Sequence, residues 1–290
     1  MYTVDNAVIM AAGAASRFAP LSYERPKALI EVKGEVLIER QIRQLQSAGI
    51  SQIYIVTGYK SEQFEYLREK LGVHILYNQE HLRRNNHSSI YAARDVIKNT
   101  YICSSDNYFV ENPFERQIDE SYYAALYADG KTNEWCMQTD TDGYISHVTV
   151  GGENAWYMLG HAFWSEDFSR KFLEILERVY EDPGVTNMFW EDIFIRNLKD
   201  LKMRIRQYSS DVIFEFDSLD ELREFDASYI GDTRSQILKW IAAELRGTEA
   251  EITQIKAVRT TALTAEGIAF CFRGRNYEHA YSDRTIKEAP

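Results

Sequence analysis

Basic residues follow a glycine-containing loop near the start of the chain. An apolar run at 8–10 leads into small residues whose main-chain N–H groups can donate to an anion, namely Ala11, Ala12 and Gly13. Arg17 adds a planar guanidinium and Lys27 a compact ammonium, and both groups bind phosphate oxygens. These parts suit the triphosphate of a nucleotide. The alternative is an ordinary strand–loop–helix turn with two solvated basic residues.

Two acidic residues that are far apart in the sequence each follow a strand-like run. Asp106 comes after residues 101–105, and Asp217 comes after residues 212–216. Mg²⁺ prefers a few carboxylate oxygens together with phosphate and water oxygens, so two aspartates and a triphosphate form a suitable set of ligands. The alternative for each aspartate is a helix N-cap or a turn, because Asp is common at both.

Aromatic and acidic residues concentrate between 134 and 215. Four of the five tryptophans lie here, Trp135, Trp156, Trp164 and Trp190, near the acids Glu134, Glu191, Asp192 and Glu215. A quaternary ammonium cannot donate ordinary hydrogen bonds, so aromatic faces and nearby carboxylates select it. The alternative is that the rings pack in the hydrophobic core, and we assign Trp164 to the core.

Strands and helices alternate through the first half of the chain, which predicts a parallel sheet with right-handed crossovers. The predicted strands are 8–11, 52–57, 73–77 and 101–105, and the predicted helices are 36–48, 61–71 and 87–98. Ligands of such sheets bind beyond the carboxyl ends of the strands. The small-residue loop, Gly58, Asn78 and Asp106 all fall at that edge of the predicted sheet.

The pattern changes to shorter strands after residue 121, which predicts an antiparallel lid. Its strands are 122–128, 135–139, 144–150 and 156–164, with a hairpin turn at 140–143; helices at 167–180, 188–198 and 219–229 and a strand at 212–216 follow. A helix at 235–245 and a small hairpin end the chain. The expected fold is a Rossmann-like mixed α/β sheet over 1–230 with a small helix and hairpin appendage over 231–290.

The composition of the 290 residues is that of a folded globular protein, with 45% hydrophobic and 27% charged residues. A formal net charge of −11 argues against nucleic acid as a partner. No run is long enough to cross a membrane, so we expect no membrane insertion and a cytoplasmic location. Three scattered cysteines without metal-ligand spacing predict reduced thiols.

The ordered motifs resemble a known family. The first strand and loop, with Ser16-Arg17-Phe18 and Pro26-Lys27-Ala28-Leu29, are similar to the signature of the nucleotide-diphospho-sugar-type nucleotidyltransferases. Further motifs resemble the bacterial CTP:phosphocholine cytidylyltransferases, namely Val56-Thr57-Gly58-Tyr59, Tyr77-Asn78, Asn85-Asn86 with Ser89, Ser105-Asp106-Asn107-Tyr108, Thr132-Asn133-Glu134-Trp135 and Glu215-Phe216-Asp217-Ser218. The resemblance runs from about residue 5 to residue 229.

This resemblance implies a role for each candidate residue. Arg17 and Lys27 bind phosphates, and Asp106 and Asp217 hold Mg²⁺. The implied nucleotide contacts are Ala11, Ala12, Gly13, Arg17, Asn78, Asn85 and Ser89, and the implied acceptor contacts are Trp135, Trp190, Glu191 and Glu215. Two positions depart from the family pattern: Ala15 stands where Gly is usual, and Glu191 stands where a shorter acid is common.

The tail has a separate likeness. Residues 251–256 and 269–277 resemble the first strands of choline/ethanolamine kinases. The intervening stretch 260–266 lacks the glycine and asparagine of a kinase phosphate loop, so we expect no kinase activity. We expect residues 232–290 to be a remnant that packs on the chain or pairs with a second copy in a homodimer; a solvated helix and hairpin without a role is the alternative.

The resemblance therefore implies Mg²⁺-dependent transfer of CMP from CTP to phosphocholine, which yields CDP-choline and pyrophosphate. Two alternatives stay open. The same chemistry could act on phosphoethanolamine or a sugar 1-phosphate, or the protein could be a non-catalytic nucleotide sensor.

Overall fold

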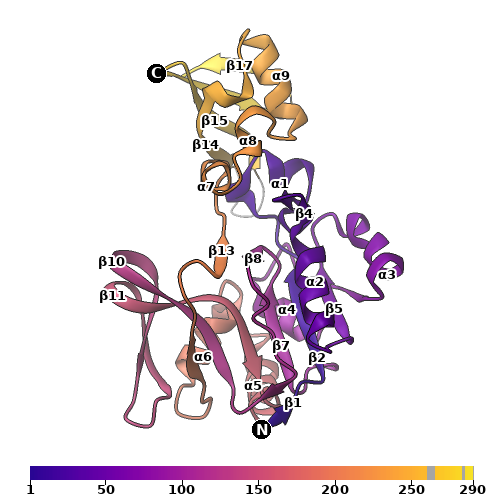
Figure 1. Cartoon of the computed structure of the whole chain (residues 1–290), viewed down its shortest axis with the longest axis vertical. Helices are drawn as coiled ribbons and strands as arrows, with labels where there is room; N and C mark the ends of the chain where they lie inside the picture. The colour runs from indigo at the N-terminus through magenta and orange to yellow at the C-terminus, as the bar shows by residue number, and fades with distance from the viewer. Residues whose placement is uncertain (260–264, 283–284, 290) are drawn as a thin grey trace. The chain divides into compact units, whose positions relative to one another are not determined.

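The structure is a computed structural model that describes residues 1–259, 265–282 and 285–289. It contains two compact units (Figure 1). Unit 1 comprises Met1–Gly13 and Ile38–Glu215, and unit 2 comprises Ala14–Leu37 and Phe216–Pro290. Residues 14–37 therefore belong with the C-terminal part of the chain. The domain boundary between residues 230 and 231 stays a prediction.

Unit 1 is built on a seven-stranded mixed sheet with the order β12-β10-β11-β7-β2-β5-β6. The four strands β6, β5, β2 and β7 are parallel, as the alternating pattern predicts, and β11 and β10 continue the sheet with antiparallel pairing. The strands are β2 (Asn6–Ala11), β5 (Ile53–Thr57), β6 (His74–Tyr77), β7 (Thr100–Ser104), β10 (Tyr122–Thr139), β11 (Ile145–Trp164) and β12 (Arg204–Gln207). The predicted mixed fold is confirmed.

Helices cover both faces of this sheet. The helices are α2 (Leu37–Ser47), α3 (Tyr66–Leu71), α4 (His87–Ala92), α5 (Glu166–Val179) and α6 (Trp190–Arg196). A buried apolar cluster joins the sheet residues Val8 and Val56 to Ile90 of α4, Phe172 of α5 and Phe194 of α6. Because side chains alternate along a strand, the neighbours of Val8 and Val56 face the other side, where Figure 1 shows α2 in front of β2 and β5.

Several predicted boundaries in unit 1 are wrong. The predicted strands 122–128 and 135–139 form one strand, β10, and the strands 144–150 and 156–164 join in β11, because β-bulges bend the ladder without ending it. The predicted helix 87–98 ends at Ala92, and the following residues form a turn in which Asn6 Nδ2 donates to Val96 O at 2.6 Å.

Other elements of unit 1 differ in detail. The predicted helix 61–71 is a 3₁₀ turn at Ser61–Phe64 followed by α3. The predicted strand 212–216 is confirmed as β13 (Ile213–Glu215), which pairs with the unpredicted β8 (Asn107–Phe109). Two further short strands that were not predicted, β1 (Tyr2–Thr3) and β9 (Gln117–Ile118), pair with each other. The pairing of β8 with β13 decides where Glu215 lies.

Unit 2 brings together two stretches that are distant in sequence. Its N-terminal stretch holds α1 (Leu21–Glu24), β3 (Glu31–Val32) and β4 (Glu35–Val36), and its C-terminal stretch holds α7 (Leu219–Phe225), α8 (Ser228–Gly231), α9 (Gln236–Glu244), β14 (Ile252–Arg259), β15 (Ala265–Phe272), β16 (Arg275–Ala280) and β17 (Thr285–Glu288). Tyr229 OH donates to Glu31 O at 2.6 Å, and Arg223 Nη1 donates to Ile252 O at 2.7 Å. The first bond joins residues 216–230 to the N-terminal stretch, and the second, which is buried, joins them to the tail.

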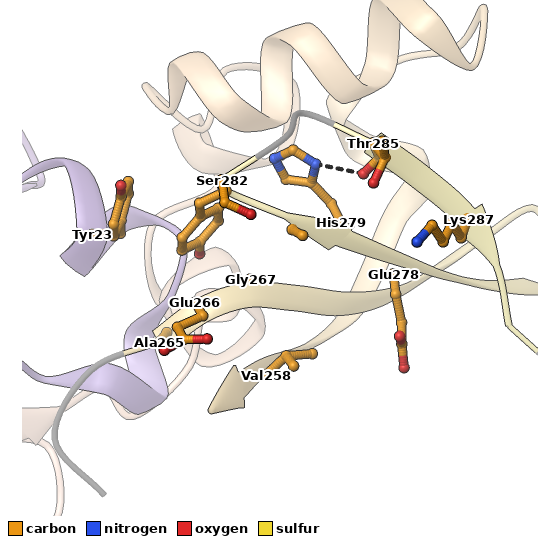
Figure 2. Close-up of a pocket in the computed structure, with 12 residues that line it drawn as sticks. Tyr23, Val258, Ala265, Glu266, Gly267, Glu278, His279, Ser282, Thr285 and Lys287 are labelled. Carbon is orange, nitrogen blue, oxygen red and sulfur yellow. Dashed lines mark hydrogen bonds between the residues drawn. The ribbon is translucent and has the colours of Figure 1, made fainter. Parts of the chain in front are cut away.

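The tail forms a four-stranded antiparallel sheet with the order β14-β15-β16-β17, which is larger than the predicted hairpin. A cavity of about 500 Å³ lies against this sheet, with Tyr23 on one side and Glu278 and Lys287 on another (Figure 2). None of the predicted site residues is among the described residues that line it. Most of the stretch 260–266, which lacks the residues of a kinase phosphate loop, lies outside the described residues. The likeness of residues 251–256 and 269–277 to kinase strands stays a prediction.

Two further predictions concern the whole chain. Cys103, Cys136 and Cys271 are free thiols, as predicted. Among the described residues, no helix is both long enough and apolar enough to span a bilayer.

Candidate active site

The end of β2 packs closely against the loop after β5 within unit 1. Tyr59 N donates to Ala12 O at 3.0 Å. A side chain at Gly58 would place its Cβ 2.9 Å from Ala12 O and closer still to His81, so only Gly allows this approach. Gly13, the next residue but one after β2, is exposed and accessible to a ligand, as a phosphate-binding loop requires.

In unit 2, the predicted phosphate-binding cations lie beside a predicted metal ligand. Arg17 Nη1 is 2.6 Å from Asp217 Oδ2, and Lys27 Nζ is 3.9 Å from Asp217 Oδ1. The Arg17 side chain is 68% exposed, whereas that of Lys27 is 7% exposed, so Lys27 is the more rigidly held cation. Ser218 caps α7 by accepting a hydrogen bond from Glu221 N, so Asp217 is not the helix cap of the alternative interpretation.

This arrangement fits a Mg²⁺–nucleotide complex. Asp217 is 41% exposed, and the cations beside it are of the types that bind phosphate. Asp106 lies in unit 1, in the turn between β7 and β8, and is partly exposed. The described residues contain no cluster of three or more His, Cys, Asp or Glu that would hold a metal by themselves, but Mg²⁺ usually needs only one or two carboxylates besides phosphate and water. The sharing of one Mg²⁺ by Asp106 and Asp217 stays a prediction.

The departure at Ala15 has a structural consequence. Ala15 adopts the left-handed conformation, with φ 46° and ψ 47°, which a residue with a Cβ tolerates poorly. We expect Ala15→Gly to stabilise the protein by about 0.5–1 kcal/mol, because the relief of strain exceeds the entropy that Gly adds to the unfolded chain. Ala14, whose φ is not positive, provides the matched control.

Urea unfolding of both variants measures this effect. Ala14→Gly should lower the free energy of unfolding by about 0.5–1 kcal/mol, since it adds entropy to the unfolded chain without relieving strain. Equal destabilisation by the two substitutions would show that the Ala15 conformation carries no strain.

The predicted nucleotide contacts after β6 are partly internal. Asn78 Nδ2 donates to Ser88 Oγ at 2.7 Å and to Ser89 Oγ at 3.3 Å, and all three residues are buried. Their side chains therefore hold the end of β6 against α4 and shape the wall of the predicted site. Asn85 is more accessible, and its Nδ2 donates to Asn187 O at 3.2 Å. Contact of these residues with a nucleotide stays a prediction.

Glu191 lies at the centre of the predicted acceptor site. Its Oε1 accepts a hydrogen bond from Tyr123 OH at 3.0 Å, and its Oε2 accepts one from Asn86 Nδ2 at 3.1 Å. Burial raises the pKa of the Glu191 carboxyl to about 7, although both hydrogen bonds act in the opposite direction. A cation beside this group would favour its ionised form.

The other acids gather around two tyrosines. Burial, and then the charges of Glu191 and Glu215, raise the pKa of Tyr123. Burial, and then the charges of Glu134 and Glu215, raise the pKa of Tyr157. Glu191 and Glu215 therefore both act on Tyr123, and Glu134 and Glu215 both act on Tyr157. Contact of these acids with an acceptor stays a prediction. Tyr123 and Tyr157 were missed, because nothing in the sequence separates these two from the other members of a set of 19 tyrosines.

The two predicted acceptor tryptophans occupy different environments. Trp135 is partly exposed and meets the exposed ring of Phe189 edge to face, with 5.9 Å between the ring centroids. Trp190 is 1% exposed, stacks on Tyr123 and meets Trp164 in the core. A ligand can therefore reach the face of Trp135, whereas Trp190 supports the site from behind. Phe189, next to Trp190, is the aromatic neighbour that the sequence analysis missed.

Comparisons with known proteins agree with this architecture. The family model of the MobA-like NTP transferase domain matches residues 7–186. The chain belongs to this family. It is therefore a nucleotidyltransferase.

This NTP transferase matches individual relatives over almost the whole length of each relative. The choline-phosphate cytidylyltransferase of Streptococcus pneumoniae is 31% identical over 221 residues, which are 76% of this chain and 96% of that protein. The 2-aminoethylphosphonate cytidylyltransferase of Lancefieldella rimae is 36% identical over 234 residues, or 79% of this chain and 95% of that protein. The solved structure of the CTP:phosphocholine cytidylyltransferase from Streptococcus pneumoniae matches 78% of this chain and 99% of its own, with a TM-score of 0.74.

Proposed function

We propose that this nucleotidyltransferase transfers CMP from CTP to phosphocholine and releases CDP-choline and pyrophosphate. The observation that carries the proposal is that unit 1 holds three acids that act on two tyrosines, together with the partly exposed ring of Trp135. The acids and tyrosines are Glu134, Glu191, Glu215, Tyr123 and Tyr157. A quaternary ammonium is bound by aromatic faces and by carboxylates that surround it without accepting hydrogen bonds from it. Two relatives named choline-phosphate cytidylyltransferase, at 31% and 30% identity, support this acceptor.

The transfer needs no protein nucleophile. A phosphoryl oxygen of the acceptor attacks the α-phosphorus of CTP in line, and pyrophosphate leaves with the electron pair of the broken P–O bond. Arg17 and Lys27 neutralise phosphate charge, and the main chain at Gly13 donates to phosphate oxygens. Mg²⁺, held by Asp106 and Asp217, would neutralise further charge on the triphosphate. The acceptor cluster orients the incoming phosphate by holding its cationic end.

A second acceptor has a specific observation in its favour. The 2-aminoethylphosphonate cytidylyltransferase is 36% identical to this chain, which exceeds the identity of the choline-phosphate enzymes named above. 2-Aminoethylphosphonate carries a primary ammonium that donates hydrogen bonds, and Glu191 or Glu215 would accept them. Both acceptors attack through a phosphoryl oxygen, but 2-aminoethylphosphonate has a P–C bond in place of the ester oxygen and a primary ammonium in place of the quaternary one.

A pyrophosphate-release assay tests the proposal. CTP, UTP, ATP and GTP are each paired with phosphocholine, 2-aminoethylphosphonate, phosphoethanolamine and glucose 1-phosphate. We expect the highest kcat/KM for CTP with phosphocholine. A preference for 2-aminoethylphosphonate or phosphoethanolamine would show that a primary amine, and not phosphocholine, is the acceptor. A preference for the sugar phosphate would refute recognition of a cation. Binding of CTP without turnover on any acceptor would identify a nucleotide sensor.

The pKa of Glu191 predicts how acceptor recognition depends on pH. Since burial raises this pKa to about 7, the carboxyl is largely protonated at pH 6 and largely ionised at pH 8. A cationic acceptor binds the ionised form more tightly, so its KM should fall several-fold as pH rises from 6 to 8. The KM of CTP serves as the internal control and should change less.

Glu191→Gln separates this effect from other titrations. The variant should show a high acceptor KM that no longer falls with pH. The same ionisation also costs folded stability as pH rises, because the folded pKa lies above the ordinary value, and this cost should disappear in the variant. An acceptor KM that keeps its wild-type pH dependence in Glu191→Gln would exclude Glu191 as the titrating group.

A further inference from the structure

In unit 1, residues 85–87 at the start of α4 are hydrogen-bonded to residues 186–188 in the loop before α6. Asn85 N donates to Thr186 O at 3.1 Å, and Asn85 Nδ2 donates to Asn187 O at 3.2 Å. His87 Nδ1 lies 2.7 Å from Met188 O, at hydrogen-bond distance. These contacts hold residues 85–87 against residues 186–188 along their whole length.

Asn86 sits in the middle of this segment and uses both ends of its amide. Its Oδ1 accepts a hydrogen bond from Trp190 N at 2.7 Å, and its Nδ2 donates to Glu191 Oε2 at 3.1 Å. Trp190 N is a main-chain donor of the first turn of α6, which no residue within the helix satisfies. One side chain therefore fixes both the start of α6 and the carboxylate of its second residue.

We propose that Asn86 is a positioning residue that holds Glu191 for the acceptor. It also couples the acceptor site to the predicted nucleotide contacts at the start of α4, Asn85 and Ser89. This inference rests on the proposed function. The same segment carries Asn85 and is followed directly by Ser88 and Ser89, the partners of Asn78. A movement of residues 85–89 on nucleotide binding is therefore transmitted to Glu191 by the Asn86 amide.

Only a side chain with both a donor and an acceptor at this length performs the task. Aspartate keeps the acceptor for Trp190 N but places a second carboxylate against Glu191. Alanine removes both bonds and leaves Glu191 with Tyr123 OH as its side-chain donor. Serine is too short to span the two partners.

The charged and titratable groups around Glu191 make its behaviour in these variants predictable. Tyr123 of β10 donates to it, Asp192 of α6 opposes its ionisation, and Glu215 acts on the same Tyr123. Loss of the Asn86 donor therefore raises the pKa of Glu191 further, and a carboxylate in place of the amide raises it more.

The test compares the full-length wild type with Asn86→Ala, Asn86→Asp and a control, Asn197→Ala. Asn197 Nδ2 donates to Ile193 O at the other end of α6, so the control weakens the same helix without touching Glu191. KM values for CTP and for phosphocholine are measured from pH 6 to pH 9, with 2-aminoethylphosphonate instead if the acceptor panel selects it. The dissociation constant of CTP is measured by calorimetry with and without a saturating acceptor.

We expect Asn86→Ala to raise the acceptor KM about ten-fold, since a hydrogen bond to a charged group is lost. The CTP dissociation constant measured without acceptor should stay within two-fold of the wild-type value. In the wild type a saturating acceptor should lower this dissociation constant, and in Asn86→Ala it should no longer do so. The pH at which acceptor kcat/KM is half-maximal should rise in Asn86→Ala and rise more in Asn86→Asp. Asn197→Ala should change none of these quantities.

Outcomes that contradict the inference are distinct from those that contradict the function. A wild type that transfers CMP to no acceptor refutes the proposed function. A wild type that is active, with Asn86→Ala and Asn86→Asp that keep its acceptor KM and pH profile, overturns the role of Asn86 alone. If Asn86→Ala does not fold, the nearly isosteric Asn86→Asp decides by its pH profile. Equal losses in Asn197→Ala would reduce Asn86 to a purely structural residue.

Discussion

Asp217→Asn lowers kcat for CMP transfer by a factor of about 10² or more, because the substitution removes a full charge from a group that would hold Mg²⁺ on the triphosphate. The amide keeps the size of the side chain but accepts only weak ion–dipole interactions from Arg17 and Lys27. The Mg²⁺ concentration for half-maximal activity should rise at the same time. Asp106→Asn should produce a loss of the same order.

Glu224→Gln is the matched control for this experiment. Glu224 lies exposed on α7, a few residues beyond Asp217, and its neutralisation changes the net charge by the same amount. It should leave kcat and the Mg²⁺ requirement unchanged. Because the Arg17–Asp217 pair is largely exposed, the folded stability of Asp217→Asn should differ little from the wild type. Turnover near the wild-type rate in either aspartate variant would refute the metal assignment.

Trp135→Leu and Trp190→Leu should have opposite signatures. Trp135→Leu raises the phosphocholine KM about ten-fold, which corresponds to the cation–π energy of a partly desolvated site, and leaves the KM of CTP and the melting temperature nearly unchanged. Trp190→Leu lowers the free energy of unfolding by about 2–4 kcal/mol, because its buried ring packs on Tyr123 and Trp164.

Kinetics and melting temperatures of both variants decide between these roles. In Trp190→Leu, any damage should affect CTP and the acceptor together, since Glu191 and the start of α6 move with the ring. The ratio of phosphocholine to phosphoethanolamine activity should fall in Trp135→Leu, because the primary amine keeps hydrogen bonds to carboxylates. Unchanged acceptor discrimination in Trp135→Leu would remove this ring from the acceptor site.

The predictions about the tail, residues 231–290, are those that the structure tests least. Its likeness to kinase strands and its pairing with a second copy both stay predictions. The structure adds one fact, that residues 14–37 and 216–230 pack with it in unit 2. Arg17 and Lys27, which are predicted to bind phosphate, and Asp217, which is predicted to hold Mg²⁺, therefore belong to the same unit as the tail.

The sequence by itself determined the local elements and the kind of chemistry. The short apolar run at 8–10 before Ala11, Ala12 and Gly13 indicated a buried strand followed by a loop, and the structure forms β2 there. Alternation of strands and helices dictated the parallel half of the sheet, because crossovers have one favoured hand. The residue types Arg17, Lys27 and Asp217 suggested a phosphate and metal site before their contacts were known.

Only the tertiary structure decided which side chains meet and which are buried. Trp135 and Trp190 are equivalent in a sequence, but packing against β10 and α5 buries one and leaves the other accessible. The pairing of β8 with β13 places Glu215 where its charge acts on Tyr123, the hydrogen-bond donor to Glu191, and no local sequence pattern indicates this contact. Asn86 likewise acquires its two partners from the start of α6, 104 and 105 residues further along the chain, since hydrogen bonds of this kind depend on how the whole sheet is assembled.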